Sequence, residues 1–306
     1  MSDFARMQTN DHGPRTNDLL GRTRRVLSWS LVLGLCSLVA FAAGESETMA
    51  ERTLKKIVEH QREILTGAAK QGDKLDEPNL RQQLQSVSHD YELLLRNNPN
   101  FAAGYAAYGY LLSKTEMRKE ATAMLLKADQ LDPEIALVKN QLGNLLAEDG
   151  KPVPAASFFL AAIRLEPNEP LYHYQLGTLL AEARDEFLKT NTKEWTRESL
   201  DAAMHHAFQR AMELAPDRFE FAYRYAESFY DLEKPDWAGA LKAWSALEEK
   251  APSAIERQTM RLHAANVLIK MGKREHAQAL LRTVDEPGLQ GQKQKLVAQL
   301  AGTAKN

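Results

Sequence analysis

The fold is decided by residues 136–169, ALVKNQLGNLLAEDGKPVPAASFFLAAIRLEPNE. Apolar residues recur in this stretch at helical spacing on two segments, and Asp149-Gly150 separates the two. Gly150 suits the left-handed conformation that closes a helix, and Pro152 suits the first turn of the next one. The stretch therefore predicts two helices joined by a tight turn.

The same pattern returns along the chain with a period of 34 residues. Four small or proline positions have counterparts one period earlier. These pairs are Gly143 with Gly109, Ala155 with Ala121, Ala162 with Ala128 and Pro167 with Pro133. Gly177 continues the series one period later, again after a leucine. Because one helix pair cannot bury its apolar face alone, such a period predicts a stacked repeat array.

The pattern resembles the tetratricopeptide repeat: a Leu-Gly pair, a large residue three positions on, then Gly, Ala, a large residue, Ala and Pro. The resemblance covers most of the chain after its N-terminal segment. It implies an all-α fold, a right-handed superhelix or α-solenoid of about five helix-turn-helix units with a concave groove. A degenerate N-terminal helix pair and a C-terminal capping helix are expected at its ends. Many unrelated systems use this fold, so it does not name the function.

These predictions divide the chain into five parts. They are a cytoplasmic polar and basic region at 1–25, an apolar segment at 26–43, a degenerate capping helix pair at 44–99, the repeat array at 100–287, and a C-terminal capping helix and tail at 288–306. Within the array, the repeats are expected near 102–135, 136–169, 170–218, 219–252 and 253–287.

The third repeat carries an insertion of about 15 residues near 186–198, because its closing proline comes 49 residues after Pro167 instead of 34. We expect a longer hairpin loop or an extended helix pair there. The alternative is a protrusion on which Trp195 contacts a partner, since a solvated loop has no need of an aromatic residue.

Residues 26–43, VLSWSLVLGLCSLVAFAA, carry no charge and follow a basic flank. A basic flank, an apolar run and Ala-Phe-Ala are the parts of a secretory signal peptide, which would be cleaved near Ala42. The run is also long enough for a single membrane-spanning helix. Either way the following chain lies across a bacterial inner membrane, anchored on its periplasmic side or exported to the periplasm.

The composition gives no sign of catalysis. The formal net charge is −2, which does not favour nucleic acid as a partner, and the single cysteine, Cys36, excludes an intramolecular disulfide. No phosphate-binding loop or zinc-protease motif is present in the sequence. The adjacent His205 and His206 point about 100° apart on a helix and are poorly placed to share a metal. We expect no enzyme activity, no cofactor and no metal.

In tetratricopeptide proteins the first helix of each repeat lines the groove, at positions around the Leu-Gly pair. Carried over by the resemblance, these positions are Tyr110, Asn140, Asn144, Tyr174, Thr178, Tyr223, Glu227, Tyr230 and Asn266. The two asparagines lie four residues apart on one helix face, where their amides suit the backbone of an extended peptide. Each tyrosine has an equally good alternative role in packing between repeats.

The family's carboxylate clamp requires lysines and an arginine on the first helices. Ala106, Tyr110, Leu171 and Gln175 stand at those positions. The groove therefore favours a neutral or basic partner segment over an acidic C-terminus.

The leading interpretation is a non-catalytic protein–protein interaction scaffold or adaptor of the bacterial cell envelope. It would bind a protein or peptide segment in the groove and contact the inner membrane through residues 26–43 if they are uncleaved. The alternative is an accessory subunit of an envelope enzyme or of an export or maturation machine, for example in cytochrome maturation or polysaccharide export. A third possibility is a stand-alone hydrolase or glycan-binding protein.

Overall fold

The structure is a computed structural model that describes residues 47–72, 75–115, 117–190 and 195–302. Within these ranges the chain is helical and contains no strand. It divides into two compact units: unit 1 ends at Asp149, and unit 2 begins at Gly150. The predictions for residues 1–25 and 26–43 lie outside the described residues. None of the described helices is long and apolar enough to span a membrane.

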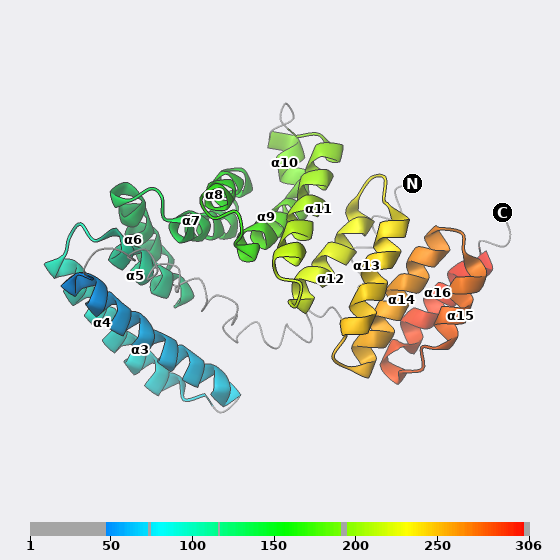
Figure 1. The fold of residues 1–306 in the computed structure, drawn as a ribbon, viewed down its shortest axis with the longest axis horizontal. Coiled ribbons are helices and arrows are strands. Elements are labelled where there is room, and N and C mark those ends of the chain that lie inside the picture. Colours follow the sequence, from blue (N-terminus) through cyan, green and yellow to red (C-terminus); the bar gives the residue numbers. More distant parts are fainter. Residues whose placement is uncertain (1–46, 73–74, 116, 191–194, 303–306) are drawn as a thin grey trace. The chain divides into compact units, whose positions relative to one another are not determined.

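Unit 1 contains the helices α3 (Met49–Gln71), α4 (Glu77–Asn97), α5 (Ala102–Lys114), α6 (Arg118–Leu131) and α7 (Ala136–Glu148). The first two form an antiparallel hairpin (Figure 1). Helix α3 begins at Met49 because the side chain of Thr48 accepts a hydrogen bond from the backbone of Glu51, which completes a capping box. Inside the hairpin, the buried Tyr91 hydroxyl donates to the Gln61 side chain at 2.8 Å.

The small residues of the period lie where helices α5 and α6 approach each other. Gly109 faces Leu125 so closely that an added Cβ would stand 2.7 Å from its Cγ atom. Ala121, Leu125 and Ala128 are fully buried. The two helices of the first repeat therefore approach each other closely at small residues of the period. At the end of α7, Gly150 has a φ of 72°, the left-handed conformation predicted for the turn.

Unit 2 contains nine α-helices and two short 3₁₀ helices within the described residues. They are α8 (Pro152–Leu165), α9 (Pro170–Glu182), α10 (Arg184–Thr190), α11 (Arg197–Leu214), α12 (Phe219–Ser228), η4 (Phe229–Asp231), α13 (Trp237–Lys250), α14 (Ala254–Lys270), α15 (Arg274–Arg282), η5 (Pro287–Leu289) and α16 (Gln290–Gly302).

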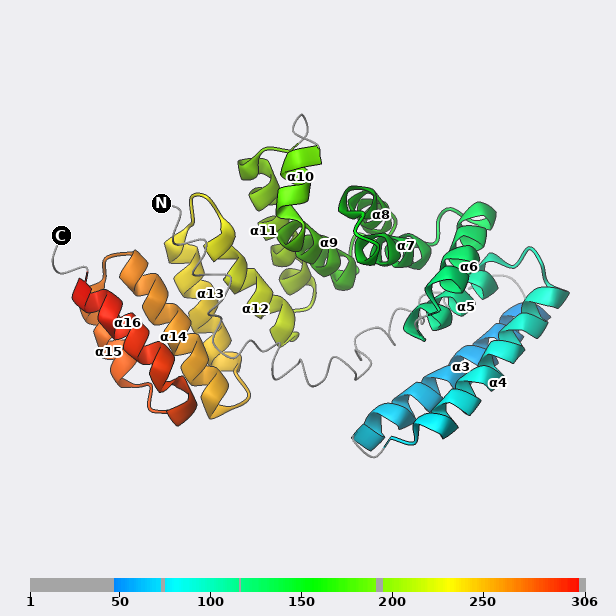
Figure 2. The ribbon, with the colours of Figure 1, turned by 180° about the vertical axis from the view of Figure 1, so that it is seen from behind.

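Each helix of unit 2 packs mainly on its sequence neighbours or on the next helix but one. Helix α9 approaches α11 closely, since an added Cβ at Gly177 would lie 2.9 Å from the Phe208 ring. Helices α14, α15 and α16 pack against one another at the C-terminal end (Figure 2). Leu289 and Leu300 are buried there while Val297 is exposed, as suits a capping helix.

The extra residues of the third repeat form α10 and the beginning of α11. Asp201 of α11, whose side chain is 3% exposed, links α11 to α10. Its carboxylate pairs with Arg184 at 3.0 Å and with Arg197 at 2.6 Å. Beyond this ion-pair network, Trp195 is half-buried, and its ring meets Phe187 edge to face with centroids 6.0 Å apart.

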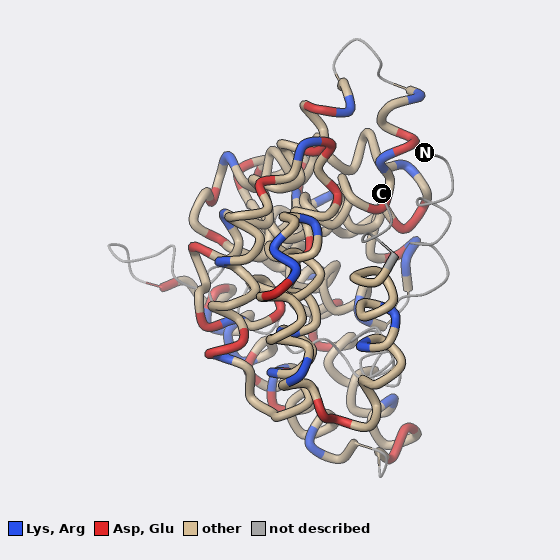
Figure 3. The backbone as a smooth tube through the Cα atoms, turned by 90° about the vertical axis from the view of Figure 1, so that its right-hand side faces the viewer, with Lys and Arg blue, Asp and Glu red and all other residues tan. Residues whose placement is uncertain are grey.

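Charges of both signs are mixed along the helices. Figure 3 shows lysine and arginine interspersed with aspartate and glutamate along the tube, without a region of one charge. Many form local pairs, such as Lys139 with Asp129 at 2.5 Å and Arg210 with Glu213 at 2.7 Å.

Candidate partner-binding site

Predicted groove residues of unit 2 lie along one connected surface, which begins on α9. The half-buried Tyr174 donates a hydrogen bond from its hydroxyl to Glu220 Oε1 on α12 at 2.9 Å. Its ring tilts against Phe221 at 4.8 Å between centroids and meets the edge of Phe208 at 5.9 Å. Burial, followed by the nearby Glu220 carboxylate, raises the pKa of Tyr174, so this hydroxyl stays a hydrogen-bond donor at neutral pH.

The surface continues from α12 to α14 through a group of aromatic rings around His263. The His263 ring stacks on Trp244 with centroids 4.0 Å apart and an interplanar angle of 8°. Tyr223 stands perpendicular to it, with its hydroxyl 3.4 Å from His263 Nε2. The Tyr230 hydroxyl donates to the backbone carbonyl of His263 at 3.2 Å. Two predicted tyrosines are thus held by a histidine that was not predicted.

This aromatic environment keeps the imidazole neutral. Burial lowers the pKa of His263 from its ordinary value of 6.5 to about 4. At neutral pH the ring is therefore uncharged and packs like an aromatic side chain while retaining polar nitrogen atoms. We call the tyrosine face the surface made by Tyr174, Glu220, Tyr223, Glu227, Tyr230 and His263.

The arginines near the tyrosine face are engaged with protein groups. Arg224 forms an ion pair with Glu227, and its guanidinium lies 4.9 Å from the Phe208 ring centre. Arg218 lies over the ring of Phe221 at 4.9 Å. Glu220 is the exposed carboxylate of this face and accepts the tyrosine hydrogen bond through one oxygen. A partner's positive group would find this carboxylate accessible.

The two remaining predicted residues of unit 2 are Thr178 and Asn266. The half-buried Thr178 donates its hydroxyl to the carbonyl of Tyr174 in its own helix at 3.0 Å. Asn266 is also half-buried. Burial raises the pKa of Tyr230, and a hydrogen bond with Asn266 lowers it in part. Asn266 therefore lies next to the tyrosine face, whereas the Thr178 hydroxyl is already hydrogen-bonded to the backbone of its own helix.

In unit 1, the predicted residues lie on α5 and α7. Tyr110 is 3% exposed, and the amine of Lys114 lies 5.4 Å from its ring centre. Burial lowers the pKa of Lys114, an effect that the Glu148 carboxylate at the end of α7 opposes. Helices α5 and α7 are in contact with each other.

Asn140 is fully buried, and neither its amide nitrogen nor its amide oxygen has a hydrogen-bond partner. One turn further along α7, Asn144 is half-buried. A buried amide without partners is unusual in a native protein. The structure therefore leaves Asn144 accessible to a ligand and Asn140 beneath the surface.

Several site residues were only weakly predictable from the amino-acid sequence. His263 lies one helical turn before Asn266, so the same helix-face argument would have found it. Glu220 and Arg224 lie on the same helix as the predicted Tyr223. Glu220 pairs with Tyr174 on another helix, which the sequence does not show, and Arg224 pairs with Glu227 on its own helix. In the described residues, no three His, Cys, Asp or Glu side chains gather as a metal site would require.

No protein-family model and no curated protein matches this chain. Solved structures do. PilF of Pseudomonas aeruginosa is 15% identical with a TM-score of 0.55, covering 82% of this chain and 100% of its own. YrrB, described as a tetratricopeptide repeat protein with an unusual peptide-binding site, is 19% identical with a TM-score of 0.53, covering 71% and 98%. PilW, described as a widely conserved type IV pilus biogenesis factor, is 11% identical with a TM-score of 0.52, covering 80% and 99%.

At these identities the likeness establishes the fold. The chain is an all-α helical-repeat protein. Its fold is that of the tetratricopeptide repeat proteins, as the period of the sequence predicted.

Proposed function

We propose that this chain is a protein-interaction scaffold of the bacterial cell envelope and holds a partner segment on the tyrosine face. One observation carries the proposal: Tyr174, Tyr223 and Tyr230 occupy the repeat positions expected to contact ligands, and they lie on one connected surface through Glu220 and His263. Tyrosine combines a large apolar ring with a polar tip, and for this reason it is enriched at protein interfaces.

The partner segment is neutral or basic on this proposal. The nearby Arg224 and Arg218 are engaged by Glu227 and by aromatic rings, which leaves Glu220 as the exposed charged group. An acidic segment would meet that carboxylate and lose affinity, whereas a lysine or arginine would gain a charge-assisted hydrogen bond. In unit 1, taken by itself, the half-buried Asn144 would offer its amide to a partner segment.

The envelope location rests on the sequence of residues 26–43, which carries the features of a signal peptide or a membrane anchor. The fold likeness to PilW, a pilus biogenesis factor, agrees with such a location, and the likeness to YrrB agrees with peptide binding. Because the fold alone is shared, these comparisons do not identify the partner.

The test is a pull-down from envelope extract with the full chain in mild detergent, compared with a Glu220→Lys variant. The matched control is Glu249→Lys, which places the same charge change on an exposed position of α13. We expect Glu220→Lys to reduce capture of the main partner while Glu249→Lys retains it. Circular dichroism checks that both variants are folded.

Equal capture by the two variants would remove the tyrosine face from the proposal. A Trp195→Ala variant then tests the extra residues of the third repeat as the contact site. Turnover of a substrate by the purified chain would contradict a scaffold without chemistry. The identity of the captured protein separates a scaffold from an accessory subunit, because only the latter's partner is itself an enzyme.

A further inference from the structure

The two ends of the α3–α4 hairpin differ in character. Where α3 begins and α4 ends, a hollow of about 300 Å³ is lined by the apolar residues Met49, Ala50, Ile57, Leu93 and Leu94 and by the polar residues Thr53, Lys56, Asp90, Asn97 and Asn98. Met49 is 73% exposed and Leu93 is 39% exposed. Two large apolar side chains therefore meet solvent at one end of this hairpin, which we call the apolar end.

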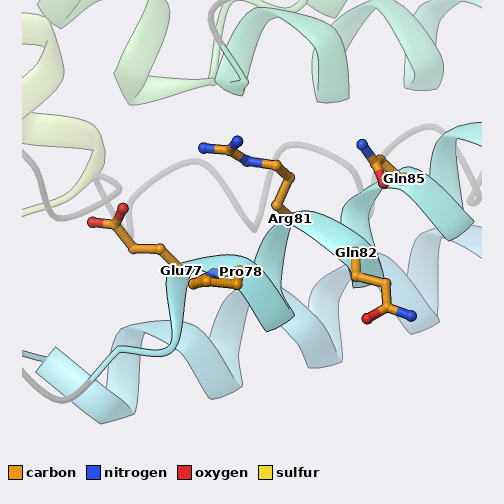
Figure 4. Close-up of a pocket in the computed structure, with 5 residues that line it drawn as sticks. All are labelled: Glu77, Pro78, Arg81, Gln82 and Gln85. Atoms are coloured by element: carbon orange, nitrogen blue, oxygen red, sulfur yellow. The ribbon is translucent and has the colours of Figure 1, made fainter.

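The opposite end of the hairpin is polar. A hollow of about 310 Å³ at the beginning of α4 is lined by Glu77, Pro78, Arg81, Gln82 and Gln85. Figure 4 shows Glu77, Arg81 and Gln85 projecting to one side of the helix and Gln82 to another. From position 82 to position 97 the helix axis extends roughly 22 Å, at about 1.5 Å per residue. The contrast in polarity therefore runs along the length of the hairpin.

The apolar end lies where the chain enters from its N-terminal segment. Residues 26–43 carry no charge, and only five residues, 44–48, separate this run from Met49. Five extended residues span at most about 18 Å. The capping box at Thr48 fixes the first turn of α3, so fraying of the helix does not lengthen the connection.

We propose that the apolar end of the hairpin docks on the surface of the lipid bilayer that residues 26–43 enter. This inference rests on the proposed envelope location and adds to it the retention of residues 26–43 as an anchor. The short connection places Met49 and Leu93 near the interface, and their apolar side chains gain from leaving water there. Lys56 lies on the same rim, where its stem can follow the apolar surface while its amine stays in water.

The bilayer is favoured over other occupants by the connection itself. A second copy of the chain or the chain's own apolar run could also cover Met49. However, if residues 26–43 are anchored in the bilayer, they are not available to cover Met49. The five-residue connection then keeps the apolar end close to the membrane. Exposed charges of both signs, such as Arg52, Lys55 and Glu92, surround this end, so we expect docking on uncharged lipid without a need for anionic lipid.

The experiment uses the full chain in phosphatidylcholine vesicles, with Cys36→Ser to remove the natural thiol. A fluorescent label is placed at the apolar end through Asn97→Cys, and at the polar end through Gln82→Cys in a second protein. Both positions are exposed. We expect a nitroxide-bearing phosphatidylcholine to quench most of the emission at position 97 and to leave position 82 unchanged. Flotation of the vesicles reports separately whether the chain is anchored.

Substitution of the apolar side chains completes the test. Met49→Gln with Leu93→Gln should abolish quenching at position 97 without affecting flotation, whereas Leu126→Gln, at an exposed leucine of α6, should leave quenching intact. Quenching that persists in the double variant, or that is equal at the two labels, overturns the docking and leaves the anchor standing. A label at position 97 that is shielded from aqueous iodide without lipid points to protein cover and also overturns it. A chain that does not float overturns both the anchor and the docking, and binding at the tyrosine face is then judged by the pull-down alone.

Discussion

We expect His263→Phe to make the stability of this protein markedly less sensitive to acid. Burial between Trp244 and Tyr223 lowers the pKa of His263 from 6.5 to about 4 in the folded chain. Because the unfolded chain binds the proton more readily, the stability contributed by this group is complete above pH 6.5 and is lost as the pH falls toward 4. For pKa values of 6.5 and 4, lowering the pH from 8 to 5 should remove about 2 kcal/mol.

The measurement is urea denaturation at pH 8 and at pH 5, followed by circular dichroism, for the wild type and for His263→Phe. Phenylalanine keeps the stacking on Trp244 and removes the titration. Burial also lowers the pKa values of His205 and His173, but both remain in the variant, so the difference between the two proteins isolates His263. The exposed His276→Gln serves as the control and should behave like the wild type. Parallel losses in the wild type and His263→Phe would refute the burial argument.

Two further predictions concern unit 1 and are measured by the same denaturation assay. Gly109→Ala should destabilise the protein by about 1–3 kcal/mol, because the new Cβ meets Leu125 at 2.7 Å, whereas Gly67→Ala has no atom within 4 Å and should be neutral or stabilise by up to about 1 kcal/mol. Equal effects of the two changes would contradict the close helix approach. Asn140→Leu should leave stability unchanged or raise it, because each buried, unpaired polar group costs roughly 1–3 kcal/mol. A clear loss of stability would instead mean that the amide is paired in solution.

The sequence predicted the fold well because the repeat positions are those at which helices touch. Gly109 and Gly177 lie where an added Cβ would meet a neighbouring side chain, and Ala121 and Ala162 are fully buried. Such positions tolerate only small residues, so they recur at a fixed period and can be found without a structure. The extra residues of the third repeat were visible as a break in that period, but their folding into α10 was not, since a seven-residue helix leaves little periodic signal.

The candidate site was less predictable because position on a helix does not determine exposure. Tyr110 and Tyr223 were placed by the same argument, yet Tyr110 is buried while Tyr223 is only partly covered. Asn140 and Asn144 share a helix face, yet only Asn144 is accessible. How far a neighbouring side chain covers a residue depends on contacts between helices, which the period does not encode. The roles of these residues in binding remain predictions.

The division between repeat positions and the positions between them explains why the fold could be predicted and the partner could not. Along α9, Gly177 serves the close contact with Phe208, and any tetratricopeptide array needs a small residue there. Tyr174, one turn earlier, donates a hydrogen bond to Glu220 on α12 instead. The repeat does not require a tyrosine at this position, so another protein of the same fold can have a different residue there. On the proposed function, the partner is contacted by residues such as Tyr174, Glu220 and His263, whose identity the repeat does not constrain. It follows that substitutions at an exposed position such as Glu220 should alter binding more than folding, and that substitutions at the glycines should do the reverse.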